Sequence, residues 1–174
     1  EFAIIRANNL NLPLLVAFGL MDDYPDANLR HYTFMLQGLQ DAQKTLTKRG
    51  IKMVVQYGNP ADVVIKLSKD AALAVVDRGY LKPVKSWREK AAKEMPCKLI
   101  QVETDVVVPV DTVSDHAEFA ARTIRPKITR LLDKFIQPVE KISVKKKSLS
   151  LDVSGFDLSD ITELANSLKL DKSV

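Results

Sequence analysis

A chain of 174 residues with 46% hydrophobic and 28% charged residues has the composition of an ordinary globular protein and the length of a single domain with a short extension. The formal net charge of +4 is too small to indicate nucleic-acid binding by itself, and a single cysteine, Cys97, excludes an internal disulfide framework. No stretch approaches the roughly 20 apolar residues of a membrane helix, and no signal-peptide pattern opens the chain. These features predict a protein of a reducing compartment, the cytosol or, in a eukaryote, the nucleus, with no membrane partner.

The first hundred residues alternate between helical and extended patterns. Residues 1–9 have the pattern of the C-terminal part of a helix. The run 14–21 is apolar except for Gly19, which predicts a strand over 14–20 buried on both faces of a sheet. A buried helix turn would also lack alternation, but the run is short and Pro13 stands before it. Further helices are predicted over 29–48, 61–70 and 84–95, and further strands over 51–57, 71–77 and 98–103.

This alternation predicts an α/β fold, a Rossmann-like parallel sheet with helices on both faces. Gly50 closes the long helix, and Asn59 with Pro60 caps the next one. The only tryptophan, Trp87, falls on the apolar face of its helix, so we expect it to be buried. Because parallel α/β units usually open with a strand and this chain opens in a helix, we expect the first strand to be missing by truncation.

After residue 103 the alternation stops, and the pattern predicts three parts in all. Residues 1–104 are predicted to form the α/β domain, 105–136 a helical connector, and 137–174 a basic linker leading into a further helical region. Within these, 105–110 is expected to be extended, 114–135 helical with an interruption at Pro126, and 159–168 a small amphipathic helix capped by Ser159.

Common signatures of catalysis and cofactor binding are absent from the sequence. It contains no GxGxxG, phosphate-binding P-loop, GxSxG or CxxC. His31 and His116 are far apart and show no metal-ligand spacing with Cys97, so both are interpreted as structural or surface residues. We therefore predict no catalytic residue and no metal site in this chain.

Two acidic segments follow predicted strands at the carboxyl edge of the sheet, where α/β proteins bind ligands. Asp22 and Asp23 follow the first strand, although a solvated acidic loop is the alternative. Asp77, Gly79 and Tyr80 follow the strand 71–77, where glycine permits a tight turn and tyrosine can stack on a flat ligand. These five residues are the predicted pocket.

Two stretches indicate a family. The run LRHYTFMLQGL at 29–39 and the run AARTIRPKI at 120–128 closely resemble segments of class II cyclobutane pyrimidine dimer photolyases, and GNPA at 58–61, WRE at 87–89 and VPV at 108–110 stand where similar residues occur in that family. The resemblance extends from residue 1 to about residue 135. It implies the N-terminal α/β domain of a flavoprotein that uses light to repair ultraviolet-damaged DNA.

In that family FAD, the electron-transfer tryptophans and the lesion pocket belong to a C-terminal helical domain, which this chain does not contain. The resemblance therefore implies that damaged DNA and the protein's own helical domain are the partners. It also implies that the α/β domain holds, in some members, a deazaflavin or folate antenna. In the family's strand order, a first strand lies between 14–20 and 71–77, with 51–57 and 98–103 outside them, so we expect a gap there.

Three cations near Pro126, namely Arg122, Arg125 and Lys127, are predicted to dock the connector on the helical domain or its cofactor, because the guanidinium fork suits specific contacts. The alternative is a set of solvated charges on a helix that packs through its isoleucines. Two other functions stay open. One is a stand-alone nucleotide-binding or stress-type α/β module, although no glycine-rich phosphate loop is visible. The other is a non-repair light sensor of the same flavoprotein superfamily.

Overall fold

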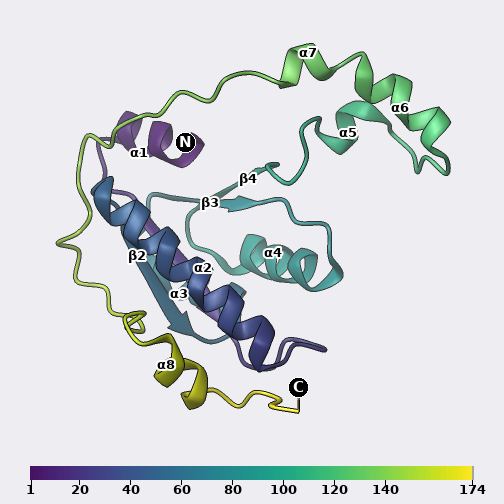
Figure 1. Cartoon of the computed structure of the whole chain (residues 1–174). Coiled ribbons are helices and arrows are strands. Elements are labelled where there is room, and N and C mark those ends of the chain that lie inside the picture. The colour runs from purple at the N-terminus through teal and green to yellow at the C-terminus, as the bar shows by residue number, and fades with distance from the viewer. Residues whose placement is uncertain (174) are drawn as a thin grey trace.

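The computed structural model describes residues 1–173, and the order of elements is the predicted α/β alternation (Figure 1). The first part contains α1 (Phe2–Leu10), β1 (Leu15–Leu20), α2 (Leu29–Lys48), β2 (Lys52–Tyr57), α3 (Pro60–Leu67), a 3₁₀ turn (Ser68–Asp70), β3 (Leu73–Asp77), α4 (Lys82–Glu94) and β4 (Lys98–Val102). The second part contains α5 (Val110–Val113), α6 (Ala121–Thr129), α7 (Leu132–Phe135) and α8 (Ile161–Ser167).

The four strands form two parallel pairs. β1 pairs with β2, with Val16 opposite Met53, and β3 pairs with β4, with Val75 opposite Ile100. Within residues 1–173 no hydrogen-bonded ladder joins β1 to β3, so the predicted pairing and the separation of these two strands are confirmed.

Local sequence signals explain where the main helices begin and end. Asn28 and His31 form a capping box at the start of α2, in which each side chain accepts a backbone N–H of the other residue. At the end of α2, Gly50 has φ 78° and donates to Thr47, while Ile51 donates to Leu46, which is a Schellman arrangement that needs glycine. The predicted cap of α3 is also present, since the Asn59 side chain accepts from Ala61.

The core lies around β2. Met53, Val54 and Val55 are all buried, as expected for a parallel strand covered on both faces. α2 packs over β2, and α3 packs against β1 so closely that a Cβ on Gly19 would lie 2.5 Å from Cα of Pro60. β3 and β4 contain no fully buried residue, so the second strand pair is covered less completely than the first.

The segment after residue 147 packs on the α/β layers. Phe156 donates its N–H to the carbonyl oxygen of Val55 at 2.7 Å, on the edge of β2 that faces away from β1. Leu158 is 1% exposed, and α8 packs against α2 (Figure 1). Residues 148–170 therefore contribute to the main core, although the boundary predicted at residue 137 stays a prediction.

The connector differs from the prediction. Residues 105–110 form no strand, and the helix predicted from residue 114 begins only at Ala121, because the preceding residues form a loop around the Glu118 carboxylate. Pro126 lies inside α6, and the interruption falls at Arg130 and Leu131. A proline ring has helical φ and costs one backbone hydrogen bond, which this short helix tolerates.

Three smaller features complete the description. The cap of α8 is Asp160, which accepts from the N–H of Glu163, and not Ser159, whose hydroxyl donates to Asp157. Trp87 is half-buried rather than buried, with its ring edge-on to Tyr24 at 6.3 Å between centroids. Over residues 1–173, every helix is too short or too polar to cross a membrane.

Candidate functional site

The predicted residues after β3 lie together at the carboxyl edge of β3 and β4. Asp77 accepts hydrogen bonds from the N–H and the hydroxyl of Thr104, at 3.1 and 2.7 Å. The Tyr80 hydroxyl donates to Glu103, and the Gly79 carbonyl accepts from Arg88 at 2.6 Å. The polar groups of these predicted pocket residues are therefore bonded to the protein itself.

Arg78 is the centre of this edge, and sequence reasoning did not select it. Its guanidinium lies 3.2 Å from the Glu103 carboxylate and 2.7 Å from that of Asp111, and it stands over the Tyr80 ring at 5.9 Å. The Glu103 side chain is only 10% exposed and also accepts from the N–H of Val110 at 3.0 Å. The cluster thus ties β3, β4 and the start of α5 together.

The charges of the cluster stabilise one another. The hydrogen bond from Arg78 lowers the pKa of Asp111, and the same contact raises the pKa of Arg78. Burial works against ionisation of Asp77, but hydrogen bonds with Thr104 and Asp105 outweigh it and lower the pKa of Asp77. The hydrogen bond to Asp77 in turn raises the pKa of Asp105. An acidic residue at the end of β4, Glu103, was the available sequence signal for this cluster.

The second predicted pair, Asp22 and Asp23, borders a cleft at the ends of β1 and β2. Asp22 accepts from the Tyr57 hydroxyl at 2.8 Å and from the N–H of Lys169 at 3.1 Å, and these bonds lower the pKa of Asp22. The cleft measures about 250 Å³ and is lined by Met21, Asp22, Asp23, Tyr57, Gly58 and Asn59. Asp23 is exposed, and Tyr57 is 58% exposed, so the cleft offers an exposed aromatic ring and an exposed carboxylate.

A larger cleft of about 370 Å³ lies between α4 and the β3–β4 pair. Val76 and Leu99 come from the strands, and Lys85, Arg88 and Glu89 come from α4. Its volume reaches the lower end of the range of small-molecule sites, about 300–1,000 Å³, whereas the cleft at Asp22 falls below it. No hydrogen bond or ion pair in the described chain joins the Asp22 group to the Asp77 group.

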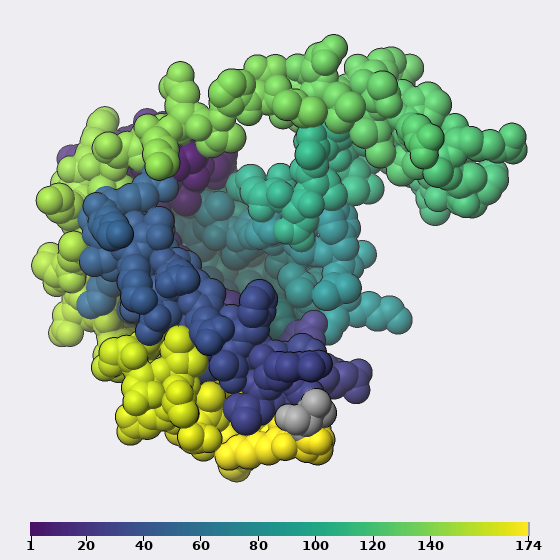
Figure 2. Space-filling view, in the orientation of Figure 1, coloured from purple at the N-terminus to yellow at the C-terminus, as the bar shows by residue number. Residues whose placement is uncertain are grey.

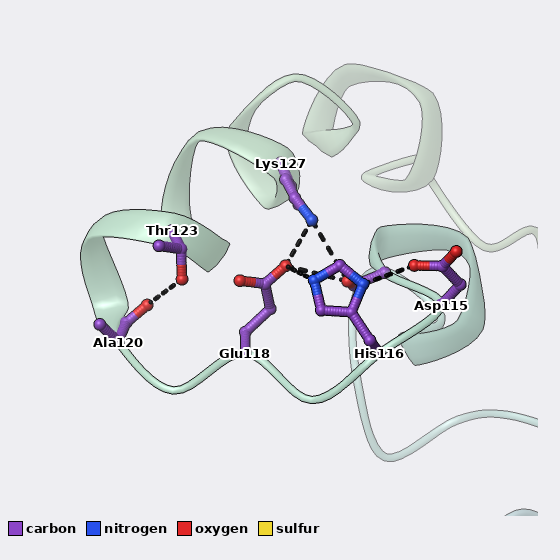
Figure 3. Close-up of polar contacts among 7 residues, drawn as sticks. Asp115, His116, Glu118, Ala120, Thr123 and Lys127 are labelled. Carbon is purple, nitrogen blue, oxygen red and sulfur yellow. Dashed lines mark hydrogen bonds and ion pairs between the residues drawn. The ribbon is translucent and has the colours of Figure 1, made fainter.

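The three predicted docking residues behave differently from one another, and Figure 3 shows the contacts of Lys127. Lys127 donates to the Glu118 carboxylate and lies 3.2 Å from the Ser114 hydroxyl, so its charge is used within the connector. The Glu118 side chain is 5% exposed, and hydrogen bonds, chiefly the one from Lys127 and then those from Thr123 and Ser114, lower its pKa to about 2. Arg122 and Arg125 are exposed on α6, and no ion pair involves either in the described residues.

The histidines have local partners. His31 belongs to the capping box of α2, and the His116 ring lies 2.6 Å from Asp115 and 3.4 Å from Glu118 (Figure 3). Among residues 1–173, no three histidine, cysteine or acidic side chains gather closely enough to hold a metal ion.

Comparison with known proteins shows one family. The family model for DNA photolyase matches residues 2–144. The chain is 47% identical over 152 residues to the deoxyribodipyrimidine photo-lyase of Methanothermobacter thermautotrophicus. The aligned region covers 87% of this chain and 34% of that protein. It is 30% identical over 149 residues to the Arabidopsis thaliana protein of the same name (83% of this chain, 30% of the relative) and 33% identical over 129 residues to that of Potorous tridactylus (72% and 24%). The chain thus spans no more than about a third of the length of these relatives.

Proposed function

The chain belongs to the DNA photolyase family, and we propose that it forms the N-terminal α/β portion of a light-dependent lyase that splits cyclobutane pyrimidine dimers in DNA. The observation that carries the proposal is the 47% identity to a deoxyribodipyrimidine photo-lyase over 87% of this chain. The two parallel strand pairs and their flanking helices agree with a supporting α/β domain. The FAD implied by the resemblance is assigned to the helical domain, so no residue of this chain receives a role in dimer cleavage.

The test uses a chimera in which this chain replaces the corresponding third of the Methanothermobacter relative. The chimera should bind flavin and remove dimers from ultraviolet-irradiated oligothymidylate in light but not in darkness. The control is the relative carrying its own segment, prepared in parallel. A chimera that does not fold, or that folds and retains flavin but repairs no dimer, would contradict the role of this chain as the supporting domain of a repair enzyme.

The stand-alone nucleotide-binding module makes a different prediction. It requires the 174-residue chain alone to bind an adenine nucleotide, which isothermal titration can measure directly. The segment between β1 and α2 contains three aspartates and no glycine-rich phosphate loop, so nucleotide phosphates would meet like charge there. We therefore expect no heat of binding with ATP.

We also propose that an antenna chromophore, a deazaflavin or a folate, binds at the carboxyl edge of the sheet. Asp77, Gly79 and Tyr80 are held by internal contacts, so the open cleft that Asp22 and Asp23 form with Tyr57 is the better supported position. At about 250 Å³ this cleft would enclose only part of such a chromophore. The exposed Tyr57 ring offers a surface for stacking. Fluorescence polarisation of each chromophore should rise with this chain, and Tyr57→Ser should abolish the rise while Tyr57→Phe keeps it.

Docking of the connector on the helical domain is proposed for Arg122 and Arg125, with Lys127 acting indirectly. Figure 2 shows the connector extending as an arm from the rest of the molecule. Phe119 on this arm is 88% exposed, which is an unusual exposure for a phenylalanine. The chimera carrying Arg122→Gln and Arg125→Gln should unfold at lower temperature, whereas the same change in the isolated chain should leave its unfolding unaltered.

A further inference from the structure

A concentrated positive charge lies in the short segment of residues 141–147, which we call the lysine strap. It contains Lys141, Lys145, Lys146 and Lys147 and no acidic residue. These four charges equal the +4 of the whole chain, so the other residues together are neutral. A local excess of this kind creates a positive potential that the small net charge conceals.

The strap has a defined path. The side-chain amide of Asn8 donates to the carbonyl of Ser143 at 2.9 Å, and its oxygen accepts the N–H of Lys145 at 2.7 Å. Arg49 donates to the carbonyl of Ile142 at 3.0 Å, and Glu1 accepts the N–H of Ile142 at 3.1 Å. These contacts hold the strap against α1 and the C-terminal end of α2.

The end of the strap is fixed as well. Ser148 is 1% exposed, donates its N–H to the carbonyl of Gly50 at 2.9 Å, and accepts the N–H of Lys52 at 2.7 Å through its hydroxyl. The stem of Lys147 lies across Gly50, where a Cβ would come within 2.8 Å of it. Because the backbone is already ordered, binding through this segment loses less conformational entropy than binding through a free linker.

All four lysine side chains of the strap are exposed. Lys141 and Ser143 are exposed, whereas Ile142 and Val144 between and after them are half-buried. The chain bends at residues 145–146, and the three consecutive lysines there are all exposed. No ion pair engages any of them within the described residues. Figure 2 shows this yellow-green segment lying open on the flank of the molecule beside α2.

We propose that the lysine strap binds the phosphate backbone of duplex DNA, independently of sequence and of damage. The inference rests on the proposed function, because a dimer-splitting enzyme must hold DNA beside its lesion. Lysine is a point charge suited to phosphate, and neutralising phosphates releases counterions. The exposed side chains of the strap are lysines and Ser143, with no aromatic anchor for a membrane, so the surface matches a polyanion rather than a lipid interface.

The test measures binding of the full 174-residue chain to an undamaged fluorescent DNA duplex by anisotropy between 50 and 200 mM salt. The triple variant Lys145→Gln, Lys146→Gln, Lys147→Gln should bind roughly tenfold or more weakly at 50 mM salt. Its slope of log affinity against log salt should be smaller by about 0.9 for each phosphate that the variant no longer neutralises. The control, Lys66→Gln with Lys69→Gln and Lys93→Gln, removes three exposed charges elsewhere and should keep the wild-type slope.

A second variant tests the ordering of the strap. Asn8→Ala removes both of the Asn8 side-chain hydrogen bonds to the strap and no charge, so it should weaken binding while the salt slope stays unchanged. Equal weakening of DNA binding in the lysine triple variant and in its control would overturn the proposal. Polyglutamate that competes as strongly as unlabelled DNA at equal charge would also overturn it and would indicate an acidic protein partner. Since the duplex is undamaged, failure here leaves the repair assay on the chimera untouched.

Discussion

Leu158→Ala tests whether the C-terminal segment is part of the folded α/β unit. Leu158 is 1% exposed and belongs to the main core together with Tyr32, Leu36 and Val55. Truncating a leucine at such a site costs the transfer free energy of the removed methyl groups plus a cavity term, about 2–5 kcal/mol in all. A domain typically has about 5–15 kcal/mol of unfolding free energy, so this single change would remove a large part of it.

Urea denaturation of the chain, followed by circular dichroism, measures the decrease in stability. With a slope of about 2 kcal/mol per molar urea, the middle of the usual range for small proteins, the midpoint should fall by roughly 1–2.5 M. Leu149→Ala is the matched control, because Leu149 lies in the same segment and is 44% exposed. We expect that control to lie within about 0.5 kcal/mol of the wild type. If both variants unfold at the same urea concentration, residues 148–170 do not contribute to the core and their packing on the α/β layers is wrong.

Three further predictions address the strands, the connector and the flavin. Gly19→Ala should destabilise the chain by about 1–3 kcal/mol, because the new methyl would lie 2.5 Å from the Pro60 backbone, whereas Gly38→Ala, with open space and a helical backbone, should stabilise it by up to about 1 kcal/mol in the same urea assay. A Gly19→Ala variant as stable as the wild type would contradict the close approach of α3 to β1. The Glu118 carboxyl should titrate near pH 2 by NMR, so the stability that its ion pair contributes is complete above pH 4.5 and is lost as the pH falls through about 2. Lys127→Met should move the pKa of Glu118 back toward 4.5. An unchanged pKa would show that Lys127 is not the cause of the shift. The isolated chain should purify without flavin absorbance and should not repair dimers in light; a stoichiometric yellow cofactor would refute this.

The α/β part of the fold was predictable because its signals are local. Apolar runs bounded by turn residues marked the four strands, and Gly50 and Asn59 marked helix ends within one or two residues. The connector was not predictable to the same degree, because its loop is set by Glu118, whose partner Lys127 lies nine residues further along the chain. The local apolar pattern contains no information about such a contact, and it therefore predicted a helix through residues 114–120 as well.

In the candidate site, too, the positions of residues at strand ends were predictable from the sequence, whereas their contact partners were not. Topology placed Asp77 and Tyr80 at one edge of the sheet, as expected from the strand ends. Their actual partners, Glu103 and Thr104, directly follow the next strand, β4, and their position depends on its register, which a single sequence does not supply. The burial of Leu158 was also missed, since it stands between the polar residues Asp157 and Ser159 and lacks a periodic pattern.

The separation between β1 and β3 has a consequence for cooperativity. No ladder joins the two strand pairs in the described chain, and α3 connects them through its contacts with β1 and α4. Amide protons on the β1–β2 ladder should therefore exchange at a different free energy of opening from those on the β3–β4 ladder, since each pair opens as its own unit. A parallel strand added between them would bond along both of its edges. Such a strand would join the two units of local unfolding into one, so that a change that stabilises one strand pair would also raise the free energy of opening of the other pair.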